Sequence, residues 1–249
     1  MKNILNKIYI HPIFLFTVLI FILLGRFKFL IYFMLLILVH EFGHIIMSLI
    51  FKWKIDKIII LPFGGLTKYN EIINRPLIEE FLVAISGIIF QLIFYKFIEI
   101  YINYNYLLFI NYFIIIFNLL PIYPLDGSKI LNVLFNKITN FKNSILLIVI
   151  TSYMCIIILS LLLFNVNKLL FMILVFLFME VNKYYKEKDL IFNKFLLERY
   201  LNNLKFKKEK IIKNVYKMKK DYRHIFYIDN KYMTESTFLK KMYEDKYNF

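Results

Sequence analysis

The segment Phe29–Phe51, FLIYFMLLILVHEFGHIIMSLIF, is long and apolar enough to cross a lipid bilayer as one helix. Its only charged or imidazole side chains are His40, Glu41 and His44, which fall within little more than one helical turn. Because ionisable groups at this depth are costly, three of them together indicate a function.

The spacing of the two histidines suits a metal ion. Residues four apart lie on the same helix face, so the imidazoles of His40 and His44 can bind one ion. Glu41 lies on the adjoining part of that face, where its carboxylate can act on a metal-bound water. HExxH also occurs by chance in soluble helices, but without a metal this cluster would carry a desolvation penalty of several kcal/mol in the bilayer. The stretch therefore favours zinc hydrolysis within a membrane.

The composition is that of a membrane protein with several spans. Of the 249 residues, 60% are hydrophobic and 20% are charged, which does not fit a soluble globular protein. Residues 183–249 hold 18 Lys and Arg against 9 Asp and Glu, a basic tail that attraction to anionic lipid explains. No nucleic-acid partner is expected. The single cysteine, Cys155, excludes a disulfide framework and a cysteine-rich metal site.

We predict an all-α polytopic membrane protein with about six transmembrane helices. The first apolar run is taken as a retained span, because no small-residue cleavage site follows it. Lysines follow the second and fourth spans and the link 101–106 has no charge, which gives an N-in, C-in topology, although Arg26 and Lys28 oppose it. The predicted spans are about 10–25, 29–51, 77–100, 106–121, 144–164 and 168–182.

Two shorter segments complete the predicted architecture. Residues 57–66, KIIILPFGGL, are too short to span, and their isoleucine run closed by proline and glycines predicts a membrane-associated strand and a turn. The edge of such a strand can pair with an extended substrate, and an ordinary interfacial loop is the equal alternative. We divide the chain into a transmembrane domain that carries the HExxH motif, 1–182, and a small α+β cytosolic domain with a basic composition, 183–249. In the latter we expect one or two helices over 183–221, a strand over 223–230 and a helix beginning near 234.

The two histidines need a third protein ligand, because a catalytic zinc usually has three and a water. His11 and His224 stand near the N-terminus and in the tail, so a carboxylate is expected. Asp126 stands out because it lies in the segment 118–127, NLLPIYPLDG, after two prolines that break the helix, and broken helices in membrane proteins usually line cavities. A turn aspartate that caps the next helix is the alternative. The remaining carboxylates of the membrane region sit near span ends: Glu79, Glu80, Glu99 and Glu180.

The pair HEFGH and NLLPIYPLDG resembles the site-2 protease family, the intramembrane zinc metalloproteases of peptidase family M50. That family's pattern is HExxH on one span and N-x-x-P-x-x-x-L-D-G on a later one. The resemblance implies that Asp126 is the third zinc ligand and that Asn118 lies near the active site and helps to hold substrate. The segment 84–88, AISGI, resembles the family's small-residue Gly-Pro element, with Ile88 in place of the proline.

Six spans and one short C-terminal domain resemble a sporulation subgroup of the family, which processes the inactive precursor of a mother-cell sigma factor. The resemblance implies a protein of the bacterial cell membrane or forespore membrane, with membrane-protein inhibitors among its partners. Relatives carry a C-terminal CBS domain that is thought to sense nucleotide. Residues 205–249 match a reduced CBS-like unit weakly, so ATP there is a minor expectation.

The implied reaction is hydrolysis of a peptide bond in a membrane-associated protein substrate. One Zn²⁺ per chain, held by His40, His44 and Asp126, would lower the pKa of a bound water to near ~7. Glu41 would take the proton and pass it to the leaving amine. A helical substrate must first unwind, and we expect Gly64 and Gly65 of the segment 57–66 to help to hold the unwound stretch.

Three other functions stay open. A prenyl-processing-type membrane zinc protease also uses HExxH, but its third ligand is a glutamate on a later helix, and NLLPIYPLDG counts against it. A catalytically inactive zinc-binding scaffold would not need Glu41 as a base. A metal transporter usually draws acids and histidines from several spans, which are lacking in this sequence.

Overall fold

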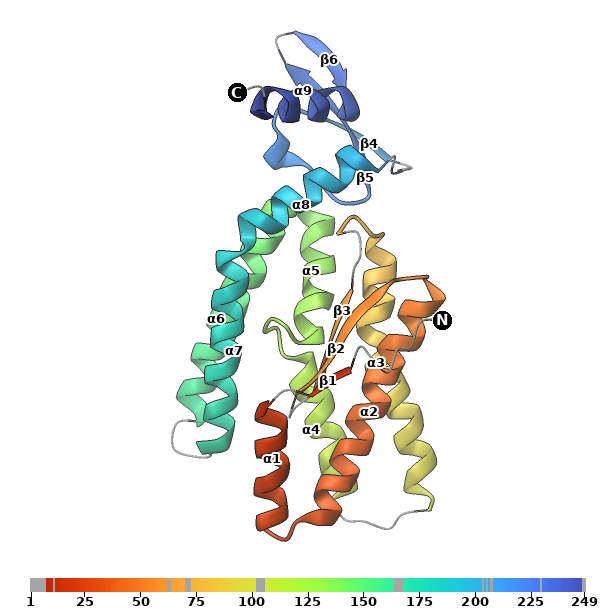
Figure 1. Cartoon of the computed structure of the whole chain (residues 1–249), viewed down its shortest axis with the longest axis vertical. Helices are drawn as coiled ribbons and strands as arrows, with labels where there is room; N and C mark the ends of the chain where they lie inside the picture. Colours follow the sequence, from red (N-terminus) through yellow and green to blue (C-terminus); the bar gives the residue numbers. More distant parts are fainter. Residues whose placement is uncertain are drawn as a thin grey trace. The chain divides into compact units, whose positions relative to one another are not determined.

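The structure is a computed structural model of the chain, and it is mostly helical (Figure 1). The structure describes residues 8–10, 12–61, 64–69, 73–101, 106–163, 168–202, 204, 206, 208–228 and 230–247. Some residues within the segments used for the predictions above lie outside these ranges, namely His11, Pro62, Asp229 and most of the link 101–106. The helices are α1 Pro12–Leu23, α2 Phe27–Ile50, α3 Leu77–Glu99, α4 Leu107–Leu119, α5 Asp126–Ile138, α6 Phe141–Leu163, α7 Lys168–Lys186, α8 Lys188–Leu201 and α9 Glu235–Tyr247. The strands are β1 Ile8–Ile10, β2 Ile55–Leu61, β3 Gly64–Tyr69, β4 Lys208–Ile212, β5 Tyr222–Ile228 and β6 Lys231–Thr234.

The chain divides into two compact units. The first unit contains Met1–Glu71, Phe81–Leu120 and Leu125–Gly127, and the second contains the rest of the chain. The predicted division between residues 182 and 183 stays a prediction.

Three helices of the described part of the chain are long and apolar enough to cross a membrane, and they span Phe27–Ile50, Leu77–Glu99 and Phe141–Leu162. Shorter apolar helices cover Phe14–Leu23 and Leu107–Leu119. A helix therefore lies at each of the six predicted positions. The number of six spans stays a prediction, because only three helices among the described residues are both long and apolar enough to cross a bilayer.

Helix α2 has one exposed apolar face and one buried face. Its exposed positions include Ile31, Leu38 and Phe42, as expected of a face turned to lipid. Its other face is buried and carries both the apolar core and the polar HExxH residues. The buried core of the first unit joins α2, α3 and α4 through Phe33, Leu36, Ile37, Tyr95, Leu107, Ile110 and Ile114.

A three-stranded sheet in the first unit has the order β1-β2-β3. Strand β1 is parallel to β2 and β3 is antiparallel to it, so β3 forms one edge of the sheet. The predicted strand over the isoleucine run is confirmed as β2. Gly64 and Gly65 do not lie in a turn but begin β3, where they pair with Leu61 and Ile60. Strand β3 contacts α2, the helix that carries HExxH.

In the second unit, strand β4 pairs in parallel with β5, and β5 pairs antiparallel with β6. The predicted strand over 223–230 and the helix beginning near 234 are confirmed as β5 and α9. The predicted helical stretch 183–221 is wrong beyond Leu201, because residues 208–212 form β4. The backbone of β4 bonds to a strand more than ten residues away, which a lysine-rich composition does not reveal. The core of this unit contains Phe141, Ile145, Phe192, Phe195, Leu196, Ile212, Met218, Phe226 and Leu239.

Candidate metal centre

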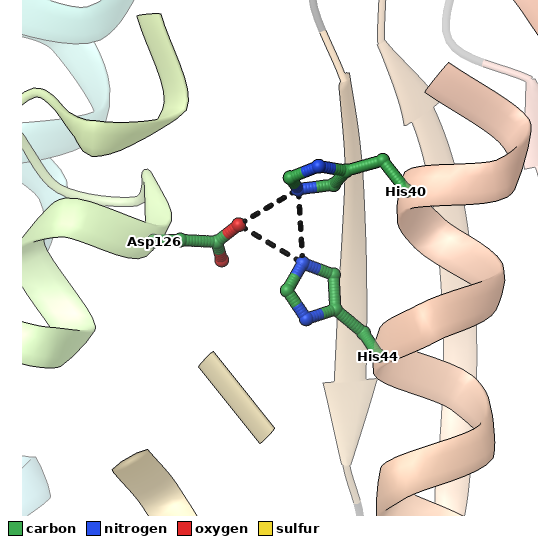
Figure 2. A group of neighbouring side chains, drawn as sticks. All are labelled: His40, His44 and Asp126. Atoms are coloured by element: carbon green, nitrogen blue, oxygen red, sulfur yellow. Dashed lines mark hydrogen bonds and ion pairs between the residues drawn. The ribbon is translucent and has the colours of Figure 1, made fainter. Parts of the chain in front are cut away.

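The side chains of His40, His44 and Asp126 converge on one point of the first unit (Figure 2). The two Nε2 atoms lie 3.1 Å apart, and Asp126 Oδ2 lies 3.0 Å from that of His40 and 2.9 Å from that of His44. The three residues are 1%, 5% and 4% exposed. The structure thus brings together the three residues that the sequence predicts as ligands, from α2 and from the first residue of α5.

The tautomers of both histidines follow from their other ring nitrogens. His44 Nδ1 lies 2.7 Å from the carbonyl oxygen of Val83, which can only accept, so Nδ1 carries the proton. His40 Nδ1 lies 2.9 Å from Gln91 Oε1 and donates to it in the same way. Both Nε2 atoms therefore present lone pairs toward the Asp126 carboxylate.

The donor set fits a zinc ion. Two nitrogen lone pairs and a carboxylate repel one another at these distances unless a cation sits among them. Ligand atoms held tetrahedrally at about 2.0–2.1 Å from one zinc stand about 3.3 Å apart, close to the observed separations. Two imidazoles and one carboxylate leave a fourth position open, which is the pattern of catalytic zinc sites.

Glycines allow the close approach of α2 and α3 at this site. A Cβ on Gly43 would lie 2.7 Å from the backbone oxygen of Ser86. A Cβ on Gly87 would lie 2.4 Å from His44 Nε2 and 2.7 Å from His40 Nε2. Gly87 belongs to the AISGI segment, so its lack of a side chain makes room for the two imidazoles. Ile88, which stands in place of the family's proline, is buried in an uninterrupted α3.

The helix break in the segment NLLPIYPLDG determines the position of Asp126. Helix α4 ends at Leu119 and α5 begins at Asp126, with Pro121 and Pro124 between them. A Cβ on Gly127 would lie 2.1 Å from the backbone oxygen of Leu119, so only glycine fits where the chain returns to the end of α4. Asp126 is the first residue of α5, yet its Oδ2 points to the histidines.

Glu41 is buried beside the ligands but does not belong to the converging group. Thr67 Oγ1, on β3, donates to Glu41 Oε2 over 3.5 Å. The HExxH carboxylate is therefore linked to the edge strand of the sheet. Thr67 could not be found from the sequence, because the register of β3 against α2 is not encoded locally.

The remaining predicted site residues lie on α4 and β3. Asn118 is buried on α4, and its Nδ2 donates to the carbonyl oxygen of Ile114 one turn earlier, at 3.0 Å. This hydrogen bond joins the Asn118 side chain to its own helix. Gly64 and Gly65 are the first residues of β3.

Sequence reasoning missed Gln91, a fully buried amide on α3. Its side chain contacts His40 on one side and Asn111 of α4 on the other. A lone glutamine in the middle of an apolar span was the available signal, because such a residue needs polar partners there.

Comparisons with known proteins agree with the geometry. Residues 28–105 and 95–163 match the family model described as Peptidase family M50. The chain is 34% identical over 209 residues to stage IV sporulation protein FB of Bacillus subtilis, a match covering 80% of this chain and 73% of that protein. It is 32% identical over 112 residues to a zinc metalloprotease of Methanocaldococcus jannaschii, covering 41% of this chain and 32% of that protein.

A solved structure is similar as well. The site-2 protease from Methanocaldococcus jannaschii superposes with a TM-score of 0.59 at 25% identity, over 71% of this chain and 89% of that chain. The three apolar helices and these relatives identify an integral membrane protein. The chain belongs to peptidase family M50, the site-2 protease family, and is a zinc metalloprotease.

Proposed function

We propose that this protein cleaves a membrane-associated or transmembrane protein substrate, with one Zn²⁺ held by His40, His44 and Asp126. The observation that carries this proposal is the convergence of three buried ligand atoms from α2 and α5 in a unit built on apolar helices. Because both imidazoles turn a lone pair toward the carboxylate, the group is set up for a cation.

Each side chain has a distinct part in the reaction. Zinc, when bound, supplies a Lewis acid that lowers the pKa of a water and polarises a carbonyl. Glu41 accepts a proton at its carboxylate and later returns it to the leaving amine. The hydroxyl of Thr67 orients that carboxylate from β3, and the 3.5 Å separation leaves room for the bond to tighten when substrate arrives.

The edge of β3 is proposed to hold the unwound substrate. An extended peptide can add to an exposed strand through backbone hydrogen bonds. Among the described residues, β2 is the only strand that pairs with β3. Gly64 and Gly65 begin this strand, and Thr67 links it to Glu41, so a peptide along this edge would lie close to the base. The proposal that Asn118 contacts the substrate rests on the resemblance to the family motif.

A sporulation role is proposed from the similarity to stage IV sporulation protein FB. In this proposal the substrate is a sigma-factor precursor, the membrane is that of the cell or the forespore, and membrane-protein inhibitors restrain the enzyme. The six spans with both termini inside belong to the same proposal. The CBS-like character of residues 205–249 and ATP binding there stay predictions.

The test is co-expression of the full chain with a sigma-factor precursor, as wild type and as Glu41→Gln. We expect shortening of the precursor with wild type only, while both proteins carry one zinc per chain. Glu79→Gln, which removes a carboxylate paired with Arg75 at the start of α3, is the matched control and should cleave like wild type.

Three outcomes would count against parts of the proposal. Shortening with both wild type and Glu41→Gln would mean that the host cleaves the precursor or that Glu41 is not the base. No shortening with either, while zinc is bound, would remove the substrate. Absence of zinc from purified wild type would remove the metal site.

A further inference from the structure

Gln91 places a polar amide inside a helix that can span a membrane. It is 0% exposed, and a buried amide is unfavourable unless its polar atoms have hydrogen-bond partners. Its partners are both supplied by neighbouring helices. Gln91 Oε1 lies 2.9 Å from His40 Nδ1 on α2. Gln91 Nε2 donates to the backbone oxygen of Asn111 over 3.1 Å and to Asn111 Oδ1 over 3.0 Å, both on α4.

These contacts give the amide one orientation. A backbone carbonyl can only accept, so the Gln91 atom that faces Asn111 must be the nitrogen. The oxygen then faces His40, and His40 must place its proton on Nδ1. Nε2 of His40 then carries no proton, and its lone pair faces the point where His40, His44 and Asp126 converge.

The two histidines differ in what fixes them. The proton of His44 Nδ1 is held by the backbone oxygen of Val83, which no substitution removes. The proton of His40 Nδ1 is held by a side chain. The tautomer of His40 therefore depends on a side chain, and that side chain can be mutated without changing His40, His44 or Asp126.

We propose that Gln91 is a positioning residue that fixes the tautomer and the ring orientation of His40, and that Asn111 holds Gln91 in that orientation. The inference rests on the proposed function, because it takes His40 as a zinc ligand. Partners of metal-bound histidines typically contribute 10–100-fold to metal affinity. The competing explanation is that Gln91 only joins α2, α3 and α4, as buried polar side chains do in membrane proteins.

The experiment measures zinc affinity of the full chain in lipid nanodiscs by chelator competition, with Co²⁺ absorption as a second readout. Gln91→Met keeps the volume but removes the acceptor, and we expect zinc affinity to fall about 10–100-fold with an altered Co²⁺ spectrum. Gln91→Glu keeps an acceptor for His40 Nδ1, and as the neutral acid it also keeps a donor toward Asn111, so its zinc affinity should fall less than that of Gln91→Met. If Gln91 were only a contact between helices, the glutamate would be no better than the methionine.

A matched control separates this effect from general damage. Asn136→Leu removes another buried amide, on α5, whose Nδ2 bonds to its own helix at Asn132, and zinc affinity should not change. Gln91→Asn gives the same test if the methionine variant does not fold, because its shorter amide cannot reach both His40 and Asn111. It should lose affinity as Gln91→Met does.

Several results would overturn the proposal. Unchanged zinc affinity in Gln91→Met or Gln91→Asn would do so, as would equal losses in Gln91→Met and Gln91→Glu, or a loss in Asn136→Leu of the same size. His40→Ala distinguishes the two levels of inference. If His40→Ala keeps its zinc, the proposed metal site fails; if it loses zinc while Gln91→Met does not, only the part assigned to Gln91 fails.

Discussion

At the scale of single residues, the absence of a side chain at Gly87 leaves the space in which the imidazoles of His40 and His44 meet. A methyl group there would enter the space of both imidazole Nε2 atoms, at 2.4 Å and 2.7 Å. We predict that Gly87→Ala loses zinc, because the ligand atoms cannot keep their positions and the helix backbone cannot easily move. The measurement is zinc per chain by atomic absorption after gel filtration.

Ser48→Ala is the control for this prediction. Its hydroxyl is buried on α2 but bonds to the Ile45 carbonyl of its own helix, so its loss should leave zinc content unchanged. Gly87→Ala with a full complement of zinc would show that α3 can shift and that the glycine is not needed for space.

The three converging residues could be predicted because each lies in a short local pattern. The spacing of the two histidines places them on one helix face, and Asp126 follows a helix break that the prolines and the glycine predict. Gln91 and Thr67 could not be predicted, because their roles depend on how α3 and β3 lie against α2. Such a register is set by packing among many side chains and not by any one segment.

At the scale of elements, one buried ion pair joins α8 to α9. Arg199 donates to Glu235 Oε1 over 3.0 Å, and the same guanidinium donates to the backbone oxygens of Lys219 and Tyr222. We predict that Glu235→Gln lowers the free energy of unfolding by about 3–5 kcal/mol, because it removes the carboxylate that pairs with the buried guanidinium of Arg199. Chemical denaturation followed by circular dichroism measures this change.

A surface pair provides the comparison. Arg223 and Glu209 lie 3.9 Å apart and both are more than half exposed, so Glu209→Gln should cost about 0–1 kcal/mol. Equal effects of the two substitutions would show that burial of Arg199 does not decide the stability of this unit.

The same cluster makes stability depend on pH. Burial lowers the pKa of His224 below its usual 6.5. Burial acts to raise the pKa of Glu235, but its hydrogen bonds with His224 and the charge of Arg199 outweigh that effect, so the pKa lies below 4.5. At acid pH the unfolded chain therefore binds more protons than the folded chain does at both residues.

We predict that stability is greatest above pH 6.5, falls first below that pH because of His224, and falls again below pH 4.5 because of Glu235. The measurement is the melting temperature against pH for wild type and His224→Gln. The difference between the two curves isolates the effect of His224 from that of His40 and His44. Parallel curves between pH 7 and 5 would rule out a contribution from His224.

Strands were harder to predict than helices for a physical reason. The apolar helices satisfy their own backbone hydrogen bonds, so length and composition suffice to predict them. The charged segment Lys208–Ile212 becomes a strand only because Tyr222–Ile228 pairs with it in parallel. Its composition favours a solvated helix, and the partner that overrides this preference lies elsewhere in the chain.

At the scale of the whole molecule, the metal and the buried ion pair belong to different units. His40, His44, Gln91 and Asp126 lie in the first unit, whereas Arg199 and Glu235 lie in the second. The sequence predicted a membrane part and a basic tail from composition, but this division also assigns α6 and α7 to the unit of the tail. Such a grouping depends on long-range packing that composition does not report.

Metal removal tests whether the two units are energetically separate. A ligand that binds only the folded state stabilises it by about 4.1 kcal/mol at a concentration 1,000 times its Kd. Because the three ligands come from α2 and the start of α5, we predict that chelation raises amide hydrogen exchange mainly in α2 and α3, around residues 40–44 and 83–91. Exchange in α8, α9 and β5 should change little, and mass spectrometry of the protein in nanodiscs measures both regions in one experiment. An equal rise in both units would mean that they unfold as one cooperative structure and that zinc stabilises the whole chain.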